Sequence, residues 1–219
     1  MTRVAEVSRK TKETDIFVRL CVDGNGDVKF NYPIGFMGHM LNTFARHGLF
    51  DLEVKASGDL EVDQHHLVED TGLVLGQCFA RALGERRGIR RVGSCLYPMD
   101  ETLARAAVDI SGRPYLVFEA GPSGSPPGSL PGNPAEKSVE KPAEFSGEIP
   151  GFQADTVEDF WQAFVSTAGI TLHLEILRGR SCHHKIEALF KAAARSLREA
   201  CEIDPRSADS IPSTKGVLA

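Results

Sequence analysis

The sequence has no excess of positive charge. Lys and Arg account for 25 of its 219 residues against 30 Asp and Glu, which gives a net charge of −5. Proteins that bind nucleic acid or an anionic membrane over a broad surface need the opposite balance. The composition therefore excludes such a broad attraction, and any anion that the protein binds should be small and held by a local cluster of basic side chains.

Paired cysteine motifs and long apolar runs are also absent. The cysteines are odd in number and carry no CxxC motif, which argues against a disulfide framework or a thiolate zinc site and fits a reducing compartment. No apolar run approaches the ~20 residues of a membrane-spanning helix, and residues 1–15 are polar. We expect a cytoplasmic protein that is neither exported nor inserted into a membrane. The five cysteines are Cys21, Cys78, Cys95, Cys182 and Cys201.

The first part of the chain predicts strands followed by alternating helices and strands. Strands are expected at residues 16–22 and 27–31, and the intervening Asp23-Gly24-Asn25-Gly26 segment is a strong hairpin signal, since Gly and Asn tolerate positive φ. These two strands should therefore be adjacent and antiparallel. The pattern then predicts a helix at 39–47 that ends near Gly48, a strand at 49–56 and a helix at 65–83.

The second part repeats this order of elements, with strands expected at 93–97, 105–110 and 115–119, a helix at 156–168, a strand at 170–177 and a helix at 183–201. We therefore predict an α+β fold made of a duplicated half-domain, in which two mixed sheets enclose a layer of helices. The half-repeats should span residues 1–86 and 87–219 and form one catalytic domain. Residues 121–151 are rich in Gly, Pro and Ser, and we interpret them as a surface insertion.

Six of the seven histidines fall in or beside the duplicated pattern. An HHxxE motif occurs in each half, and on a helix both of its histidines can lie beside the glutamate three or four residues later. Adjacent histidines, however, diverge by about 100° around a helix, so one ion can hardly bind both. Two such motifs with two further histidines predict a paired metal site. The candidate ligands are His39, His65, His66, Glu69, His173, His183, His184 and Glu187.

Simpler interpretations exist for each of these residues. Paired histidines at a helix start are also compatible with surface groups or N-terminal hydrogen bonding, although two copies at matching places in a repeat disfavour this. His39 and His173 are weaker candidates individually and depend on the pairs. His47 precedes Gly48 and is interpreted as a helix C-terminal cap. Imidazole and carboxylate ligands without thiolate suit Mn²⁺, Fe²⁺, Co²⁺ or Zn²⁺, and the spacing alone does not select among them.

Several basic residues fall near the ends of the predicted elements. Convergent Arg and Lys side chains with a hydroxyl group are suited to binding a small phosphate, although each one singly is also compatible with a solvated surface charge. These residues are Arg90, Arg91, Arg113, Lys191 and Lys215.

The sequence strongly resembles the imidazoleglycerol-phosphate dehydratase family. The resemblance is carried by GFMGHML, GDLEVDQHHLVEDTGLVLGQ, RRGIRRVGSCLYPMDETLARAAVDISGRPY, GITLHLEILRGRSCHHKIEALFKAAARSLREA and DPRSADSIPSTKGVL, which cover nearly the whole chain outside the insertion. It implies a hydro-lyase of histidine biosynthesis with a ribosomal protein S5 domain 2-like fold, two Mn²⁺ ions per active site and a twenty-four-membered homo-oligomer whose subunits share metal ligands. The implied reaction converts D-erythro-imidazoleglycerol phosphate to imidazoleacetol phosphate.

The resemblance also assigns roles to individual positions. The eight candidate ligands fall on the family's metal ligands, and Glu13 falls on its substrate-contacting glutamate. The positions that fall on substrate and phosphate contacts are Arg91, Arg113, Lys191, Ser213, Thr214 and Lys215, and Arg90 is the neighbour of Arg91. One departure is Gly38, because the family usually has Asp before the first metal histidine. If that Asp orients the imidazole or caps the helix, Gly38 loses the contact unless another carboxylate replaces it.

The implied chemistry explains why metals would be needed. The proton to be removed lies on a carbon that carries a hydroxyl group and no carbonyl group, so it is too weakly acidic for an unaided carboxylate. If two metals bind the ring nitrogens, the substrate's imidazole is held as an imidazolate that expels the neighbouring hydroxyl group. The candidate acids and bases are Glu13, Glu69 and Glu187.

Two other functions use the same residues. A metal-dependent hydrolase could use a metal-bound hydroxide at these ligands, although the PSTKG and SGRPY segments argue against it. A metal-stapled cage without enzymatic activity would use the HHxxE motifs only to join subunits. Stripping the metal would then dissolve that assembly, and no imidazole-bearing substrate would stabilise it.

Overall fold

The computed structural model describes residues 2–120, 145, 147–207, 210–216 and 218. The first half of the chain contains β1 (Val4–Lys10), β2 (Thr14–Cys21), β3 (Val28–Asn31), α1 (Gly35–Gly48), β4 (Asp51–Gly58) and α2 (His65–Leu83). The second half contains β5 (Val92–Met99), β6 (Thr102–Asp109), β7 (Tyr115–Glu119), α3 (Thr156–Ala168), β8 (Thr171–Arg178) and α4 (Cys182–Cys201). Most of the predicted insertion at 121–151 lies outside the described residues.

The two halves have the same topology. The strand orders are β1-β2-β4-β3 and β5-β6-β8-β7. In each sheet the first three of these strands pair antiparallel and the last two pair parallel. A helix connects each parallel pair, because parallel strands need a crossover. The predicted duplicated α+β fold with two mixed sheets is therefore confirmed.

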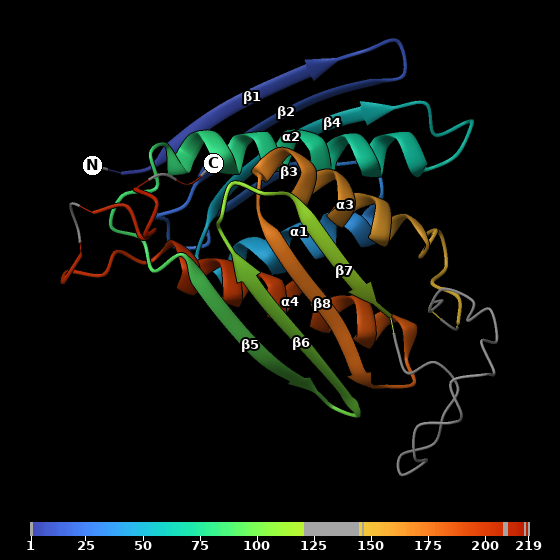
Figure 1. Ribbon diagram of the computed structural model, residues 1–219. Helices are drawn as coiled ribbons and strands as arrows, with labels where there is room; N and C mark the ends of the chain where they lie inside the picture. The colour runs from blue at the N-terminus through green and yellow to red at the C-terminus, as the bar shows by residue number, and fades with distance from the viewer. Residues whose placement is uncertain (1, 121–144, 146, 208–209, 217, 219) are drawn as a thin grey trace, which may run out of the picture.

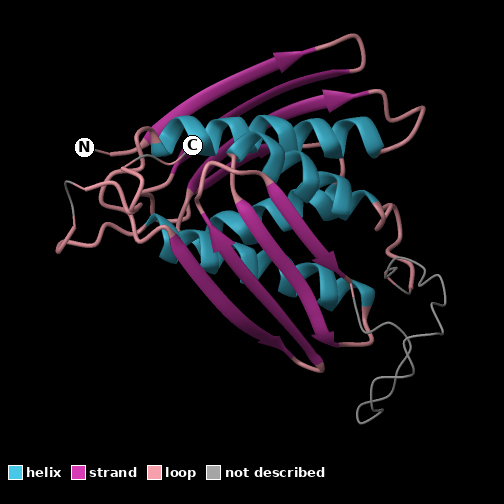
Figure 2. Cartoon of the chain, viewed as in Figure 1, coloured by secondary structure: helices cyan, strands magenta, loops and turns pink. Residues whose placement is uncertain are grey.

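The helices form the middle layer between the two sheets (Figures 1 and 2). Helix α2 packs on β1 and β2, α4 packs on β5 and β6, and the layer is completed by contacts of α2 with α3 and of α1 with α4. One continuous hydrophobic core runs through these contacts, and its largest side chains include Trp161, Phe44, Phe160 and Phe190. In the described part of the chain, no helix is long and apolar enough to span a membrane.

The predicted adjacency of the second and third strands is wrong. Strand β4 lies between β2 and β3, and β3 pairs only with β4, in parallel. The chain does turn after β2, but the turn wraps around the start of β4, where the Asp51 carboxylate accepts hydrogen bonds from the backbone N–H groups of Asn25 and Asp27. The sequence therefore predicted the turn after β2 correctly, but not the strand that β3 pairs with. That pairing is set by α1, which connects β3 to β4 as a crossover.

The sequence interpretation also missed β1. The turn from β1 into β2 contains neither Gly nor Pro, so it carries no typical turn signal. It is stabilised instead by the Thr11 hydroxyl group, which accepts hydrogen bonds from the backbone N–H groups of Glu13 and Thr14. Strand β1 lies at the edge of its sheet and buries only Val7, so its hydrophobic pattern is weak. The helices predicted at 65–83 and 156–168 and the strand at 115–119 have the predicted bounds.

Candidate active site

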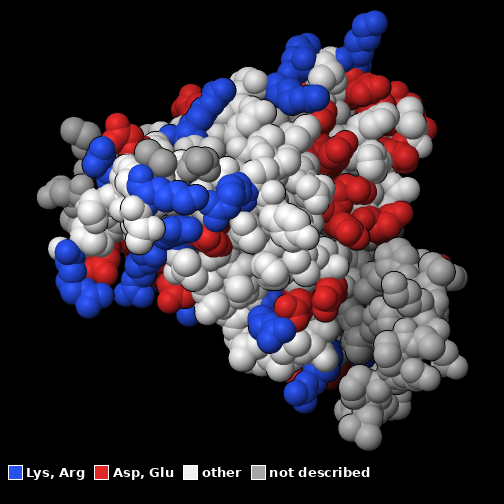
Figure 3. Space-filling view, viewed as in Figure 1, with Lys and Arg blue, Asp and Glu red and all other residues white. Residues whose placement is uncertain are grey.

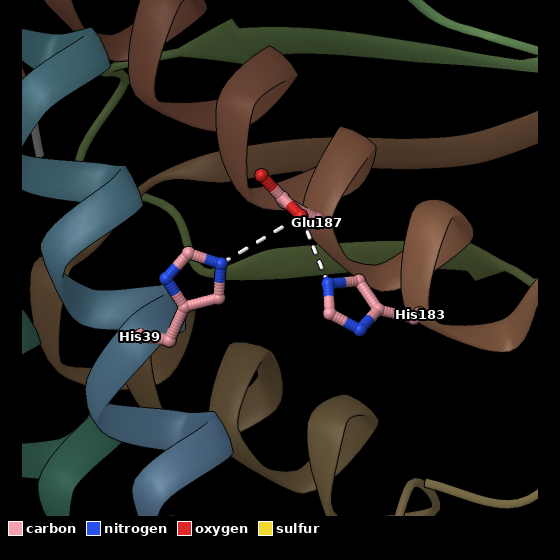
Figure 4. Close-up of side chains that lie close together, drawn as sticks. All are labelled: His39, His183 and Glu187. Atoms are coloured by element: carbon pink, nitrogen blue, oxygen red, sulfur yellow. Dashed lines mark hydrogen bonds and ion pairs between the residues drawn. The ribbon is translucent and has the colours of Figure 1, made fainter.

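Two helices from different halves bring His39, His183 and Glu187 together. His39 lies on α1, while His183 and Glu187 lie one turn apart at the start of α4, which packs against α1. Glu187 Oε2 is 3.1 Å from His183 Nε2 and 3.7 Å from His39 Nε2 (Figure 4). The glutamate is buried, whereas both histidines are exposed enough to bind a ligand from outside.

The second oxygen of Glu187 is held by Lys191, one turn further along α4. The distance from Lys191 Nζ to Glu187 Oε1 is 2.8 Å. Burial acts to raise the pKa of Glu187, but the hydrogen bond and charge of Lys191, together with His39 and His183, outweigh it, so the net pKa of this carboxyl group is lowered. Lys191 therefore keeps Glu187 anionic and leaves Oε2 directed at the two imidazoles.

The HHxxE motif of the first half lies at the start of α2. His65 is 3.7 Å from Glu69 through Nε2 and 3.2 Å from Asp159 through Nδ1, whereas His66 contacts Asp59. The rings of His65 and His66 are inclined by 73°, and those of His183 and His184 by 83°. Within each pair, the two histidines therefore face different carboxylates.

Glu13 lies beside the first motif although it is distant in sequence. It belongs to the β1–β2 turn, and its carboxylate, that of Asp59 and the ring of His66 offer ligand atoms within 4.8 Å of one another. Asp59 Oδ2 is 3.0 Å from His66 Nδ1, and this hydrogen bond raises the pKa of His66. The predicted substrate residue and the predicted metal ligand are thus neighbours.

His184 has a corresponding carboxylate, which the sequence interpretation missed. Glu101, in the β5–β6 turn, is 2.9 Å from His184 Nδ1 through Oε2, and its Oε1 accepts a hydrogen bond from the backbone N–H of Ser181. The bond with His184 is the largest of the contributions that lower the pKa of Glu101 to about 2. A sequence signal for Glu101 existed, because in both halves a Glu stands directly before a strand that begins with Thr, at residues 13–14 and 101–102.

Two other histidines lie apart from these clusters. His173 is exposed on β8, between the buried Leu172 and Leu174, so its side chain faces away from the helical layer. His47 lies in the last turn of α1 as predicted, but it is half-buried and packs edge-on against Tyr97. Burial, followed by the nearby Lys191 and Arg195, lowers the pKa of His47, which does not favour the cationic cap that the sequence predicted.

Of the predicted phosphate-binding residues, Arg91, Arg113, Ser213, Thr214 and Lys215 line one pocket of about 510 Å³. The predicted contact Lys191 does not line it and lies instead beside Glu187. Arg91 is held there by both oxygens of Asp109, at 2.7 and 2.9 Å, and donates to the Pro212 carbonyl oxygen at 2.8 Å. Figure 3 shows Lys and Arg side chains gathered at the end of the molecule where the C-terminal segment lies. Arg90 is instead paired with Glu202 and Glu199. The pocket is lined by Arg91, Arg113, Pro212, Ser213, Thr214, Lys215 and Leu218.

The start of β5 and the C-terminal segment, which carry the anion pocket, lie at one end of the subunit, and the starts of α2 and α4, which carry the paired histidines, lie at the other end (Figure 1). Arg91 immediately precedes β5, and Glu101, which contacts His184, follows its far end. Eight residues of β-strand span roughly 26 Å at ~3.3 Å per residue. A small substrate cannot bridge the two ends within one subunit.

The donor set around Glu187 fits a divalent metal ion. Two imidazole nitrogens and a carboxylate oxygen lie within 4.8 Å of one another, and donors about 2.1 Å from a shared ion stand roughly 3 Å apart when they are neighbours in its coordination shell. His39, His183 and Glu187 would hold such an ion. Nitrogen and oxygen donors without thiolate are compatible with Mn²⁺.

Gly38 leaves space beside His39. A Cβ atom at this position would meet only the Tyr32 Cβ, at 3.8 Å, which is an ordinary van der Waals distance. The absence of the carboxylate expected from the resemblance is thus not forced by packing. Among the described residues, Glu187 is the carboxylate that pairs with His39.

Comparisons with known proteins cover nearly the entire chain. It is 49% identical over 216 residues to the imidazoleglycerol-phosphate dehydratase of Methylorubrum populi, covering 99% of this chain and 100% of the relative. It is 48% identical over 217 residues to that of Gluconacetobacter diazotrophicus, covering 99% and 98%.

Solved structures agree with these sequence matches. The crystal structure of imidazoleglycerol-phosphate dehydratase from Staphylococcus aureus superposes with a TM-score of 0.72 at 33% identity, covering 92% of this chain and 99% of that one. The Pyrococcus furiosus structure gives a TM-score of 0.75 at 29% identity, covering 97% and 100%. The family's sequence model, described as "Imidazoleglycerol-phosphate dehydratase", matches residues 33–197. The chain therefore belongs to the imidazoleglycerol-phosphate dehydratase family and is an enzyme of the hydro-lyase class.

Proposed function

We propose that this enzyme removes water from D-erythro-imidazoleglycerol phosphate to give imidazoleacetol phosphate, a step of histidine biosynthesis, with two Mn²⁺ ions per active site. The observation that carries the proposal is the convergence of His39 and His183, from two helices, on one oxygen of Glu187. The resemblance adds His65, His66, Glu69, His173 and His184 as further ligands.

The proposed reaction breaks a C–O bond next to the imidazole ring and a C–H bond on the following carbon. When bound, the two ions would act as Lewis acids at the ring nitrogens and make departure of the hydroxyl group easier. A carboxylate positioned beside the second carbon then takes its proton, and the resulting enol rearranges to the ketone.

Glu13 is the best placed of the three candidate glutamates for proton transfer. Glu187 is occupied by Lys191 and two histidines, and Glu69 faces His65. Glu13 lies exposed in its turn, and none of the described residues forms a hydrogen bond with its carboxylate. Its carboxylate is therefore available to a substrate that binds beside His66.

Arg91, Arg113 and Lys215 would hold the substrate phosphate, with the Ser213 and Thr214 hydroxyl groups as further donors. Asp109 pre-orients the Arg91 guanidinium, which reduces the conformational freedom lost on binding. This pocket contributes orientation rather than chemistry, because it fixes the end of the substrate remote from the reacting carbons.

The separation of the phosphate pocket from the histidine clusters supports a shared active site. A substrate of one ring, a short carbon chain and one phosphate needs the pocket of one subunit beside the histidines of another. The exposed His173, on the outer face of its sheet, would likewise reach a metal only across a subunit boundary. We therefore propose a homo-oligomer, which the resemblance implies has twenty-four subunits.

The test is conversion of imidazoleglycerol phosphate by purified protein that has been stripped of metal and then supplied with Mn²⁺. Turnover should require Mn²⁺, vanish in Glu187→Gln and persist in the control Glu85→Gln, whose side chain is exposed after α2. An intact assembly that binds Mn²⁺ but yields no product would contradict the proposal and favour the metal-stapled cage.

A further inference from the structure

The two halves carry the same dipeptide at the same place. Glu13-Thr14 and Glu101-Thr102 each stand at the turn into the second strand of their sheet, where Thr14 and Thr102 are buried. The repeat therefore makes Glu13 and Glu101 structural counterparts. Their carboxylates nevertheless have different surroundings.

In the second half, Glu101 is fully engaged. Its Oε1 accepts from the Ser181 N–H at 3.0 Å, and its Oε2 lies 2.9 Å from His184 Nδ1. The Thr102 hydroxyl also points at Glu101, at 3.4 Å. Glu101 thus links the β5–β6 turn to the start of α4 and to the second histidine of the HHxxE motif.

In the first half, another residue takes this place. Asp59, which follows β4, lies 3.0 Å from His66 Nδ1 through Oδ2. The corresponding loop between β8 and α4, residues 179–181, contains no carboxylate. The second histidine of each motif therefore has one carboxylate at Nδ1, although the two carboxylates come from different loops.

The Thr14 hydroxyl is also directed away from Glu13. It donates to Asp70 Oδ2 at 2.5 Å, and Asp70 is buried on α2 directly after Glu69. The matching residue after Glu187 is Ala188, which cannot accept this bond. Asp59 and Asp70 together leave the Glu13 carboxylate without the contacts that occupy Glu101.

An imidazole whose Nδ1–H is held by a carboxylate presents the lone pair of Nε2 in a defined direction. We propose that Glu101 and Asp59 are positioning residues that fix this tautomer of His184 and His66 for metal binding. In this arrangement Glu13, the counterpart of Glu101, is left free for the substrate. This inference rests on the proposed function, since it takes both histidines to be metal ligands.

The test compares Glu101→Gln, Asp59→Asn and the control Glu85→Gln in the metal-free protein. Mn²⁺ affinity and stoichiometry are measured by titration calorimetry and by electron paramagnetic resonance of the bound ion, and the melting temperature is recorded without metal. We expect Mn²⁺ affinity to fall by roughly 10- to 100-fold in each test variant while the control retains the parental affinity. The metal-free melting temperature of Asp59→Asn should stay near the parental value.

Asp59→Asn separates the positioning role from a purely structural effect. Glu101 also accepts a hydrogen bond from the Ser181 N–H at the start of α4, whereas the described hydrogen bond of the Asp59 carboxylate is the one with His66. Unchanged Mn²⁺ affinity in both variants, with dehydratase activity intact, would overturn the positioning roles and leave the proposed function standing. Failure of the parental protein to bind Mn²⁺ would overturn the metal assignment itself and this inference with it.

Discussion

Lys191 and Glu187 lie one turn apart on α4 and form an ion pair, with Nζ and Oε1 separated by 2.8 Å. Both side chains are largely shielded from solvent, at 15% and 10% exposure. The lysine thereby holds one carboxylate oxygen while the other faces His39 and His183. The predicted metal ligand Glu187 and the predicted substrate contact Lys191 are therefore in direct contact, because they are four residues apart on one helix.

We expect Lys191→Met to destabilise the metal-free protein by about 2 kcal/mol, because the shielded Glu187 carboxylate loses a charged hydrogen-bond donor. The pKa of Glu187 should rise in this variant, because the hydrogen bond and the charge of Lys191, which lower it, would be lost. Urea unfolding of both single variants and of Lys191→Met/Glu187→Gln measures the coupling. If the loss of unfolding free energy in the double variant equals the sum of the two single losses, the two side chains are not coupled and the pairing is refuted.

Gly38→Ala should stabilise the protein by about 0.5–1 kcal/mol. The position is helical, and an added Cβ finds ordinary contact distance, so the substitution removes the backbone entropy cost of glycine without strain. Gly72→Ala is the matched control. There the Cβ would lie 2.4 Å from the Phe160 carbonyl oxygen on α3, and we expect a loss of about 2 kcal/mol or more. Thermal and urea unfolding should give opposite signs for the two variants.

Asp70→Ala should destabilise the protein by about 3 kcal/mol, because Asp70 is shielded and binds both Arg9 and the Thr14 hydroxyl. Asp15→Ala tests the exposed Lys10–Asp15 pair in the same region, and its removal should cost less than about 1 kcal/mol. Equal effects in urea unfolding would show that Asp70 does not anchor the turn that carries Glu13.

Asp23 should make stability depend on acid pH. The hydrogen bond from Arg3 lowers the pKa of Asp23 below its ordinary value of 3.8. A lowered folded-state pKa contributes stability that is present above the unfolded-state value and is lost as pH falls through the folded-state value. The difference in unfolding free energy between the parental protein and Asp23→Asn should therefore be largest near neutral pH and shrink below pH about 4.

Arg3 also donates to the Cys201 carbonyl oxygen, so this pair ties the N-terminal strand to the end of α4. Unfolding measured from pH 2 to 7 checks the prediction. A difference that does not vary with pH would mean that Asp23 has the same pKa in the folded and unfolded states.

The local sequence was sufficient to predict most elements and the repeat. The helices from His65 and from Thr156 show strong periodicity, and the two HHxxE motifs mark the same place in each half. Family membership also followed from the order of these motifs, and the comparisons confirm it. These properties depend on residues near one another in the chain, where helix geometry links spacing to a shared face.

Tertiary structure decided what local patterns do not contain. The placement of β4 between β2 and β3 depends on a crossover helix packing on a sheet, and a turn signal cannot report that packing. The contact of His39 with Glu187, the hydrogen bonds of Asp59 and Glu101, and the separation of the Arg91 pocket from the histidines all join residues from different elements. The sequence determined which side chains are available for metal and phosphate binding, whereas packing of the two halves determined which atoms meet, because those contacts span long stretches of chain.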